Sequence, residues 1–214
     1  MNKVIAIFRM LSRSRYLVRR QQTRFVIEQT RGKIFPVVVD IGSGTAPYKK
    51  IVAHERYIGI DIEDRGGVTD VLIEDVNKGL SLSDNTADMV LCTEVLEHVK
   101  KPDAVITELF RILKKGGTLI LTTPMVWPVH EAPNDFYRFT NFGLEYLLRE
   151  AGFRNIFVEA SNGYFYSMLQ LALIPLRKRR WLPVVFFVNI VGYIVGRIER
   201  NRNLALVYHV KAIK

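Results

Sequence analysis

The chain of 214 residues has a single cysteine, Cys92, so no disulfide can form within it. Stable disulfides belong to oxidising compartments, and this composition therefore fits a reducing one best. Acidic residues are also scarce, because 21 Asp and Glu stand against 31 Lys and Arg, for a formal net charge of +10. A basic surplus permits nucleic acid, an anionic membrane or an acidic substrate as a partner, and the distribution of the charge decides among them.

Long hydrophobic runs are missing as well. The first apolar stretch, Val4–Phe8, is broken by Arg9, and no small-residue cleavage site of a signal peptide follows it. The longest run, Trp181–Val195, is apolar except for Asn189 and is shorter than the roughly 20 residues of a membrane-spanning helix. Internal repeats and low-complexity segments are absent too. We therefore expect a globular domain that does not cross a membrane.

Short apolar runs typical of buried strands alternate with helical patterns along the chain. Residues 102–114 have the apolar spacing of a helix that stops at Gly116-Gly117, and residues 142–151 form another that stops at Gly152. This alternation predicts a mostly parallel sheet covered on both faces. The expected strands are residues 36–41, 56–61, 69–73, 88–93, 118–123, 154–159 and 204–213.

Two glycines follow the first strand in VVVDIGSGTAPYKK, residues 37–50. A glycine-rich turn between a strand and a helix lets a ligand approach the backbone at the edge where open α/β sheets bind ligands. Gly42 and Gly44 thus indicate a nucleotide-like ligand, although a plain tight turn is the alternative, because a short glycine motif is a weak signal. Asp61 ends the second strand, where a carboxylate can accept both hydroxyls of a ribose.

Two features separate this turn from a dinucleotide-binding turn. Asp40 precedes the glycines, where an apolar residue is usual, and the third glycine is absent, with Pro47 nearby. A ligand without a pyrophosphate does not need an open helix N-terminus. A cationic ligand would be attracted by Asp40. We therefore expect a cationic nucleoside, with NAD as a remote alternative.

Five segments resemble, in order and at the expected spacing, the motifs of class I S-adenosylmethionine-dependent methyltransferases. They are VVVDIGSGTAP, YIGIDIE, DNTADMVLCTEVLEHVKKP, ELFRILKKGGTLILTTP and FTNFGLEYLLREAGF. The resemblance covers residues 36–160 and the last strand, and it is to the type 11-like branch that methylates small molecules and glycans. It implies an α/β fold with a Rossmann-like, doubly wound, seven-stranded and mostly parallel sheet. It also implies S-adenosyl-L-methionine as the cofactor.

The resemblance implies cofactor contacts after four strands. The glycine turn would hold the methionine end and frame the sulfonium, and the acid after the second strand would take the ribose hydroxyls. An acid after the third strand would accept from the adenine amino group, although one extra residue before Leu80 could shift this match by one position. The implied positions are Asp40, Gly42 and Gly44, then Asp61 with Ile62 against the adenine, then Asp75 with Val76, and Thr93 with Glu94.

The acceptor side is expected in residues 124–140, PMVWPVHEAPNDFYRFT, after the fifth strand. Three prolines with polar and aromatic side chains are typical of a substrate-binding lid, and similar stretches occur in methyltransferases of cell-surface polysaccharide clusters. His130 is the first candidate for a general base, and His98 of the LEHV signature is the second. The expected substrate contacts are Trp127, Asp135, Tyr137 and Arg138, the last for an anionic acceptor.

Structural alternatives exist for these residues. Glu97 and His98 could orient their own loop, and Asp135 and Arg138 could pair to hold the lid while His130 is merely exposed. Metal ligands are not expected, because the two histidines are far apart in sequence and no carboxylate cluster accompanies them at helical spacing. Cys92 lies in a predicted strand, which indicates a small buried side chain and not a nucleophile.

The basic residues concentrate at the two ends of the chain. We expect a basic N-terminal helical segment at residues 1–33 and a methyltransferase domain at 34–214, with an apolar and basic helical insertion at about 163–200. A membrane span there would separate the last strand from its sheet. The insertion is therefore expected to dip into one anionic leaflet, to cap the acceptor pocket or to form a homodimer interface.

Together these observations predict an enzyme that methylates a small-molecule or glycan acceptor, including a lipid-linked one. Its expected place is the cytoplasm, peripheral to the inner face of the cell membrane. An RNA methyltransferase is an alternative that the charge permits, but nucleic acid is disfavoured because the basic residues flank hydrophobic runs and no RNA-binding module is present. A non-catalytic, membrane-associated scaffold that binds the cofactor is the other alternative, and the intact glycine turn and Asp61 disfavour it.

Overall fold

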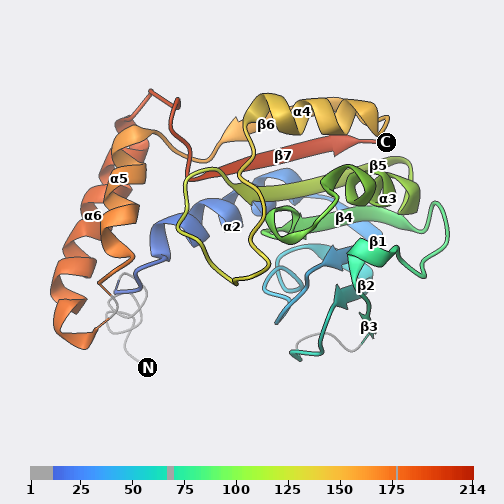
Figure 1. Cartoon of the computed structure of the whole chain (residues 1–214), viewed down its shortest axis with the longest axis horizontal. Helices are drawn as coiled ribbons and strands as arrows, with labels where there is room; N and C mark the ends of the chain where they lie inside the picture. Colours follow the sequence, from blue (N-terminus) through green and yellow to red (C-terminus); the bar gives the residue numbers. More distant parts are fainter. Residues whose placement is uncertain (1–11, 67–69, 177) are drawn as a thin grey trace.

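The computed structural model describes residues 12–66, 70–176 and 178–214. The first eleven residues of the predicted N-terminal segment, Thr69 of the third strand and Arg177 lie outside the described residues. Seven strands form one sheet in the order β3-β2-β1-β4-β5-β7-β6, and only β7 runs antiparallel to its neighbours (Figure 1). The predicted fold class is thus confirmed. The strands are β1 (Ile34–Ile41), β2 (Ala53–Asp61), β3 (Asp70–Ile73), β4 (Ala87–Thr93), β5 (Leu113–Pro124), β6 (Arg154–Ala160) and β7 (Val207–Ile213).

Helices cover both faces of the sheet. Strand residues alternate between the faces, so Met89 and Leu91 of β4 lie in one core cluster while Val90 and Cys92 lie in the other. Cys92 is fully buried, which raises the pKa of its thiol and fits the predicted structural role. The helices are α2 (Tyr16–Thr30), α3 (Pro102–Ile112), α4 (Asn141–Glu150), α5 (Tyr164–Leu173) and α6 (Leu182–Ile198), with short 3₁₀ helices η1 (Val76–Lys78), η2 (Leu96–His98) and η3 (Arg179–Trp181).

Residues 42–52 form the predicted glycine turn and further turns after it, in which Gly42, Gly44 and Ala46 adopt positive φ angles that a helix does not allow. The predicted end of the next helix was wrong. Helix α3 ends at Ile112, before Gly116-Gly117, because Leu113 already pairs with Ala87 in the sheet. The glycines therefore lie within β5, beside a register shift, and do not end the helix.

The insertion between β6 and β7 is a helical hairpin of α5 and α6 at one end of the molecule, on the left of Figure 1. Helix α6 approaches α2 closely, since a Cβ added at Gly192 would lie 2.5 Å from Leu17 Cδ1. The phenol of Tyr166 in α5 donates to the Leu17 carbonyl at 2.8 Å. Among the described residues, no helix has the length and apolar character needed to span a membrane.

Candidate active site

The glycine turn after β1 and the acid after β2 lie together, as the sequence predicted. The carboxylate of Asp61 accepts from the backbone N–H of Gly44 and of Ile62, both at 2.8 Å, one on each oxygen. Gly42 has a φ of 64°, and a Cβ there would lie 2.4 Å from the Val95 side chain. Only glycine therefore fits this position, and the turn brings backbone close to Asp61 at the carboxyl edge of the sheet.

Asp40, the last polar residue before the turn, is buried. Tyr57 of β2 donates its hydroxyl to Asp40 Oδ2 at 2.6 Å. Burial, helped by the nearby charge of Asp61, raises the pKa of Asp40 to about 7. Sequence reasoning missed Tyr57, because its place depends on strand register: Asp40 pairs with Gly59, and a residue two positions from Gly59 faces the same side of the sheet.

The predicted adenine contacts lie at the ends of β2 and β3. Ile62 is two-thirds exposed, so its side chain is available to a ligand. Asp75 caps η1, where its Oδ1 accepts from the backbone and side-chain nitrogens of Asn77 at 3.0 and 2.8 Å. These bonds lower the pKa of Asp75 and keep it ionised. Contacts from these residues and from Val76 to an adenine stay predictions.

The loop after β4 begins with Thr93 and Glu94. Glu94 has a positive φ of 56°, and its carboxylate accepts from Thr122 Oγ1 at 3.0 Å. Burial raises the pKa of Glu94, while a hydrogen bond from Gln22 and the charge of Arg15 act in the opposite direction. Helix α2 therefore contributes to this edge of the sheet, which no pattern in the sequence indicated.

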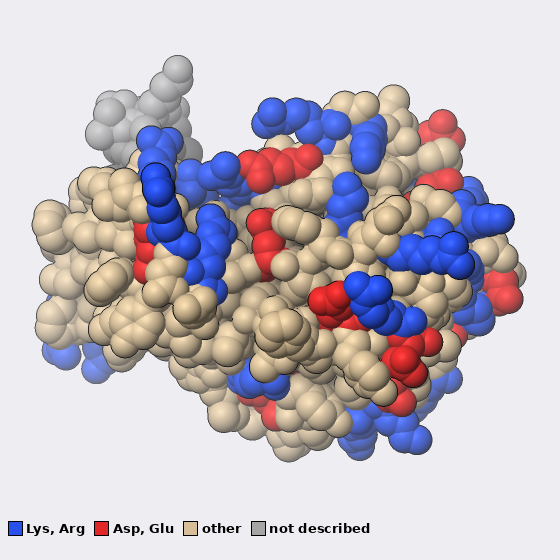
Figure 2. Space-filling view, turned by 90° about the horizontal axis from the view of Figure 1, so that it is seen from above, with Lys and Arg blue, Asp and Glu red and all other residues tan. Residues whose placement is uncertain are grey.

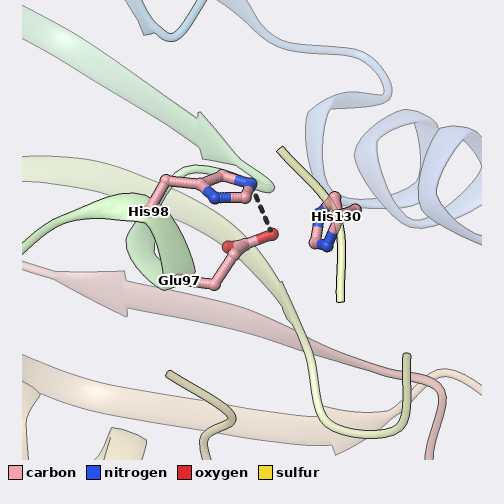
Figure 3. Close-up of side chains that lie close together, drawn as sticks. All are labelled: Glu97, His98 and His130. Carbon is pink, nitrogen blue, oxygen red and sulfur yellow. Dashed lines mark ion pairs between the residues drawn. The ribbon is translucent and has the colours of Figure 1, made fainter. Parts of the chain in front are cut away.

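The acceptor loop, residues 124–140, is tied to η2 through backbone. The Glu97 carbonyl accepts from the N–H of Phe136 at 2.9 Å, and His98 Nδ1 lies 2.7 Å from the Asn134 carbonyl oxygen. This docking brings the rings of His98 and His130 edge to face, with centroids 4.7 Å apart. Figure 3 shows His130 entering from the acceptor loop opposite the Glu97–His98 pair. Both candidate bases thus share one site.

Glu97 lies between the two histidines and the sheet. Its side chain is fully buried; Oε2 accepts from Thr123 Oγ1 at 3.2 Å, and Oε1 lies 3.8 Å from His98 Nε2. Burial and the nearby Glu94 raise the pKa of Glu97 well above its usual range. The Glu97 carbonyl and His98 Nδ1 do hold the acceptor loop, as the structural alternative expected. The side chains of both residues also face His130.

Asp135 and Arg138 form a bidentate ion pair, with Nη1–Oδ1 at 2.6 Å and Nη2–Oδ2 at 2.7 Å. Arg138 Nη2 also donates to the Trp127 carbonyl, and Asp135 Oδ2 accepts from the His130 N–H at 3.0 Å. The guanidinium holds the pKa of Asp135 well below its usual range. The donors of Arg138 hold the loop, as the structural alternative expected, and its contact with an anionic acceptor stays a prediction. His130 is only one-fifth exposed, so it is not a free surface residue.

The two aromatic candidates also have structural contacts. Trp127 packs against the cluster that contains Leu17 and Tyr166, and the Arg15 guanidinium lies 5.8 Å from its ring centroid. The hydroxyl of Tyr137 donates to the Lys100 carbonyl at 3.1 Å. Both side chains stabilise the loop, and their contact with an acceptor stays a prediction.

Comparison with known proteins agrees with this geometry. Residues 39–121 match the family described as a methyltransferase domain. The ubiquinone biosynthesis O-methyltransferase of Pseudomonas fluorescens (strain SBW25) is 30% identical over 112 residues, which are 52% of this chain and 43% of that protein. The chain thus spans less than half the length of this curated relative. The match of residues 39–121 and the methyltransferase relative support a class I S-adenosylmethionine-dependent methyltransferase domain of type 11.

Solved structures share the fold at low identity. Phosphoethanolamine N-methyltransferase 2 of Haemonchus contortus, in complex with S-adenosyl-L-methionine, has a TM-score of 0.62 and 18% identity, over 91% of this chain and 52% of that one. The cyclase SpnF has a TM-score of 0.63 and 22% identity, over 90% and 80%. A cyclase and a methyltransferase share the architecture, so the reaction has to be argued from the site.

Proposed function

We propose that this protein transfers the methyl group of S-adenosyl-L-methionine to a hydroxyl oxygen of a small-molecule acceptor. The observation that carries the proposal is the Asp61 carboxylate, fixed by the N–H groups of Gly44 and Ile62 beside the buried Asp40. This arrangement offers carboxylate oxygens to ribose hydroxyls and a second acid to a cationic methionine end. The O-methyltransferase relative supports an oxygen acceptor.

The reaction needs alignment of the acceptor and removal of one proton. The acceptor oxygen attacks the methyl carbon, the carbon–sulfur bond breaks with its electron pair moving to sulfur, and adenosylhomocysteine remains. In this proposal His130 takes the hydroxyl proton, and the contact of its ring with His98 supports a shared site for the two candidate bases. The bidentate Asp135–Arg138 pair positions His130, because Asp135 also binds the His130 backbone. Holding the two reactants in line supplies most of the acceleration.

Calorimetry with S-adenosylmethionine, adenosylhomocysteine and NAD tests the cofactor assignment. We expect both adenosyl compounds to bind and NAD not to bind, and binding of NAD alone would overturn the proposal. Release of adenosylhomocysteine with a panel of hydroxylated small molecules and glycans then tests the reaction. Cofactor binding without turnover on any acceptor of the panel would favour the non-catalytic scaffold.

We also propose that the α5–α6 hairpin attaches the enzyme to the cytoplasmic face of a membrane, where a lipid-linked or glycan acceptor would lie. The face of the hairpin turned away from α2 is apolar and exposed. In Figure 2 this end of the molecule, on the left, is mostly uncharged surface with Lys and Arg near its margins. The exposed apolar residues are Tyr164, Phe165, Met168, Trp181, Val184, Phe187, Ile194 and Ile198.

Apolar and basic groups together fit an anionic leaflet. Burying a large apolar side chain contributes about 1.5–3 kcal/mol, and each basic residue near the headgroups adds about 1 kcal/mol that salt screens. Co-sedimentation with anionic vesicles should therefore weaken, yet persist, as salt rises. Phe165→Ser with Phe187→Ser should remove the salt-resistant part, whereas Phe142→Ser, an exposed residue of α4, should change nothing. A protein that stays in the supernatant at low salt would instead point to a dimer interface or an internal cap.

A further inference from the structure

We propose that Glu97, His98 and His130 bind a divalent transition-metal ion of the Zn²⁺ type. One ligand atom from each residue can be chosen so that all three lie within 4.8 Å of one another. Figure 3 shows the carboxylate and the two imidazoles converging from η2 and from the acceptor loop. Two imidazole nitrogens and one carboxylate oxygen form a ligand set that suits Zn²⁺, Co²⁺ or Mn²⁺ better than Mg²⁺ or Ca²⁺, which prefer oxygen.

Two buried polar atoms in this cluster lack a partner. Within the described part of the chain, Glu97 Oε1 and His130 Nδ1 make no hydrogen bond, and the Glu97 side chain is fully buried. An unpaired carboxylate oxygen in a protein interior is costly. Glu97 Oε1 lies 3.8 Å from His98 Nε2, too far for a hydrogen bond between them. A cation between these atoms would satisfy the carboxylate oxygen, for which the described residues supply no other partner.

His98 is already in the tautomer that binds metal. A carbonyl oxygen can only accept, so the contact of 2.7 Å with the Asn134 carbonyl puts the ring proton on Nδ1. The other ring nitrogen, Nε2, lies 3.8 Å from Glu97 Oε1. Such an outer hydrogen bond to backbone is typical of metal-binding histidines. The buried carboxylate of Asp135 lies 3.4 Å from His130 Nδ1, although the two atoms form no hydrogen bond.

The three ligand atoms need to move only slightly closer together to bind one ion. Ligand atoms in a tetrahedral site with bonds of about 2.1 Å lie about 3.4 Å apart, so the separation of 3.8 Å between Glu97 and His98 is nearly correct. The third ligand must move by about 1 Å, and it belongs to a loop with exposed residues on either side. Glu131, two-thirds exposed and with Oε2 3.8 Å from His98 Nε2, adds a further carboxylate beside the three ligands.

The ion would also define the acceptor class, a step that rests on the proposed function. Three protein ligands leave an open position, as in catalytic zinc sites. A hydroxyl oxygen bound there would lose its proton more readily, because the cation stabilises the alkoxide or phenoxide. With the ion bound, the imidazoles would act as its ligands and the hydroxyl proton would pass to solvent water. The ion would thereby take over the role that the metal-free mechanism gives to His130.

Metal binding is tested without cofactor or acceptor, so its failure is distinct from failure of methyl transfer. The full chain is stripped with a chelator and titrated with Zn²⁺ by calorimetry and with Co²⁺ by visible absorption. We expect one ion per chain, with the absorption of a nitrogen- and oxygen-ligated Co²⁺. His98→Ala and His130→Ala should each abolish binding at concentrations that saturate the wild type, and Asp135→Asn should weaken it by about 10–100-fold.

Controls and a second variant keep the test decisive. His54→Ala removes a histidine that lies outside the cluster and should leave binding of both ions unchanged. Glu97→Gln removes the buried carboxylate ligand, and a thermal melt shows whether this variant still folds. If the Glu97→Gln variant does not fold, the two histidine variants test the metal site. A wild type that binds none of Zn²⁺, Co²⁺ and Mn²⁺ would overturn the proposal. So would binding that survives in the double variant His98→Ala/His130→Ala.

Discussion

The cofactor side and the acceptor side of this molecule are built differently. On the cofactor side, Asp40, Gly42, Gly44 and Asp61 follow two adjacent parallel strands, and their contacts are mostly with backbone. On the acceptor side, Glu97 and His98 meet His130 only because the acceptor loop docks on η2. The first arrangement depends on strand register and the second on tertiary docking. Motifs within the sheet could therefore be recognised in the sequence, whereas the meeting of Glu97, His98 and His130 could not.

The largest expected effect comes from the acceptor side. His130→Ala should lower turnover by about 10²–10⁴-fold, because a positioned general base contributes that much, while cofactor affinity stays nearly unchanged. Steady-state release of adenosylhomocysteine and calorimetry measure the two quantities. His54→Ala is the matched control. Wild-type turnover in His130→Ala would show that His130 is not the base and would leave His98 as the candidate.

An intermediate effect is expected at Asp61. Asp61→Ala should weaken cofactor binding by about 1–3 kcal/mol, or roughly 5–150-fold, because the ribose hydroxyls would lose their acceptor. Asp61→Asn keeps one acceptor oxygen and should lose less. Calorimetry on both variants gives the ranking. Equal affinity in wild type and Asp61→Ala would show that this carboxylate serves only the glycine turn.

A smaller effect separates the two glycines of the turn. Both have positive φ, but a Cβ at Gly42 would meet Val95 at 2.4 Å, whereas Gly44 has nothing within 4 Å of that position. Gly42→Ala should therefore destabilise the fold by about 1–3 kcal/mol more than Gly44→Ala, the usual cost of overpacking. Chemical denaturation of the two variants measures this difference. Equal losses would mean that backbone strain alone explains both.

The smallest expected effect is a pH dependence at Asp40. Its pKa of about 7 lies above the value in the unfolded chain, so its contribution to stability is present at acid pH and is lost as pH rises through 7. A cationic cofactor prefers the carboxylate, so affinity for S-adenosylmethionine should instead rise between about pH 6 and pH 8. Calorimetry at several pH values checks this trend. Asp40→Asn should bind more weakly and without the rise, and a variant that keeps the rise would assign it to Glu94.

Parts of the fold were predictable because they depend on short-range patterns. Buried strands have continuous apolar residues and the helices α3 and α4 have apolar periodicity, so all seven strands and both helices could be located. The turn after β1 was predictable from Gly42 and Gly44, whereas the positive φ of Ala46 has no sequence signal. The early end of α3 was missed because the pairing of Leu113 with Ala87 is a long-range contact that overrides helical periodicity.

The sheet, the glycine turn and the acid after β2 follow from the sequence, because residues adjacent in the chain at the end of a strand remain adjacent in space. Which distant side chains meet depends on how the whole chain packs. This packing paired Arg138 with Asp135, placed Tyr57 on Asp40 and brought Gln22 of α2 to Glu94. It also placed His98 beside His130 across 32 positions of sequence, through backbone hydrogen bonds between η2 and the acceptor loop. Such bonds involve groups that every residue carries, and no side-chain pattern marks them.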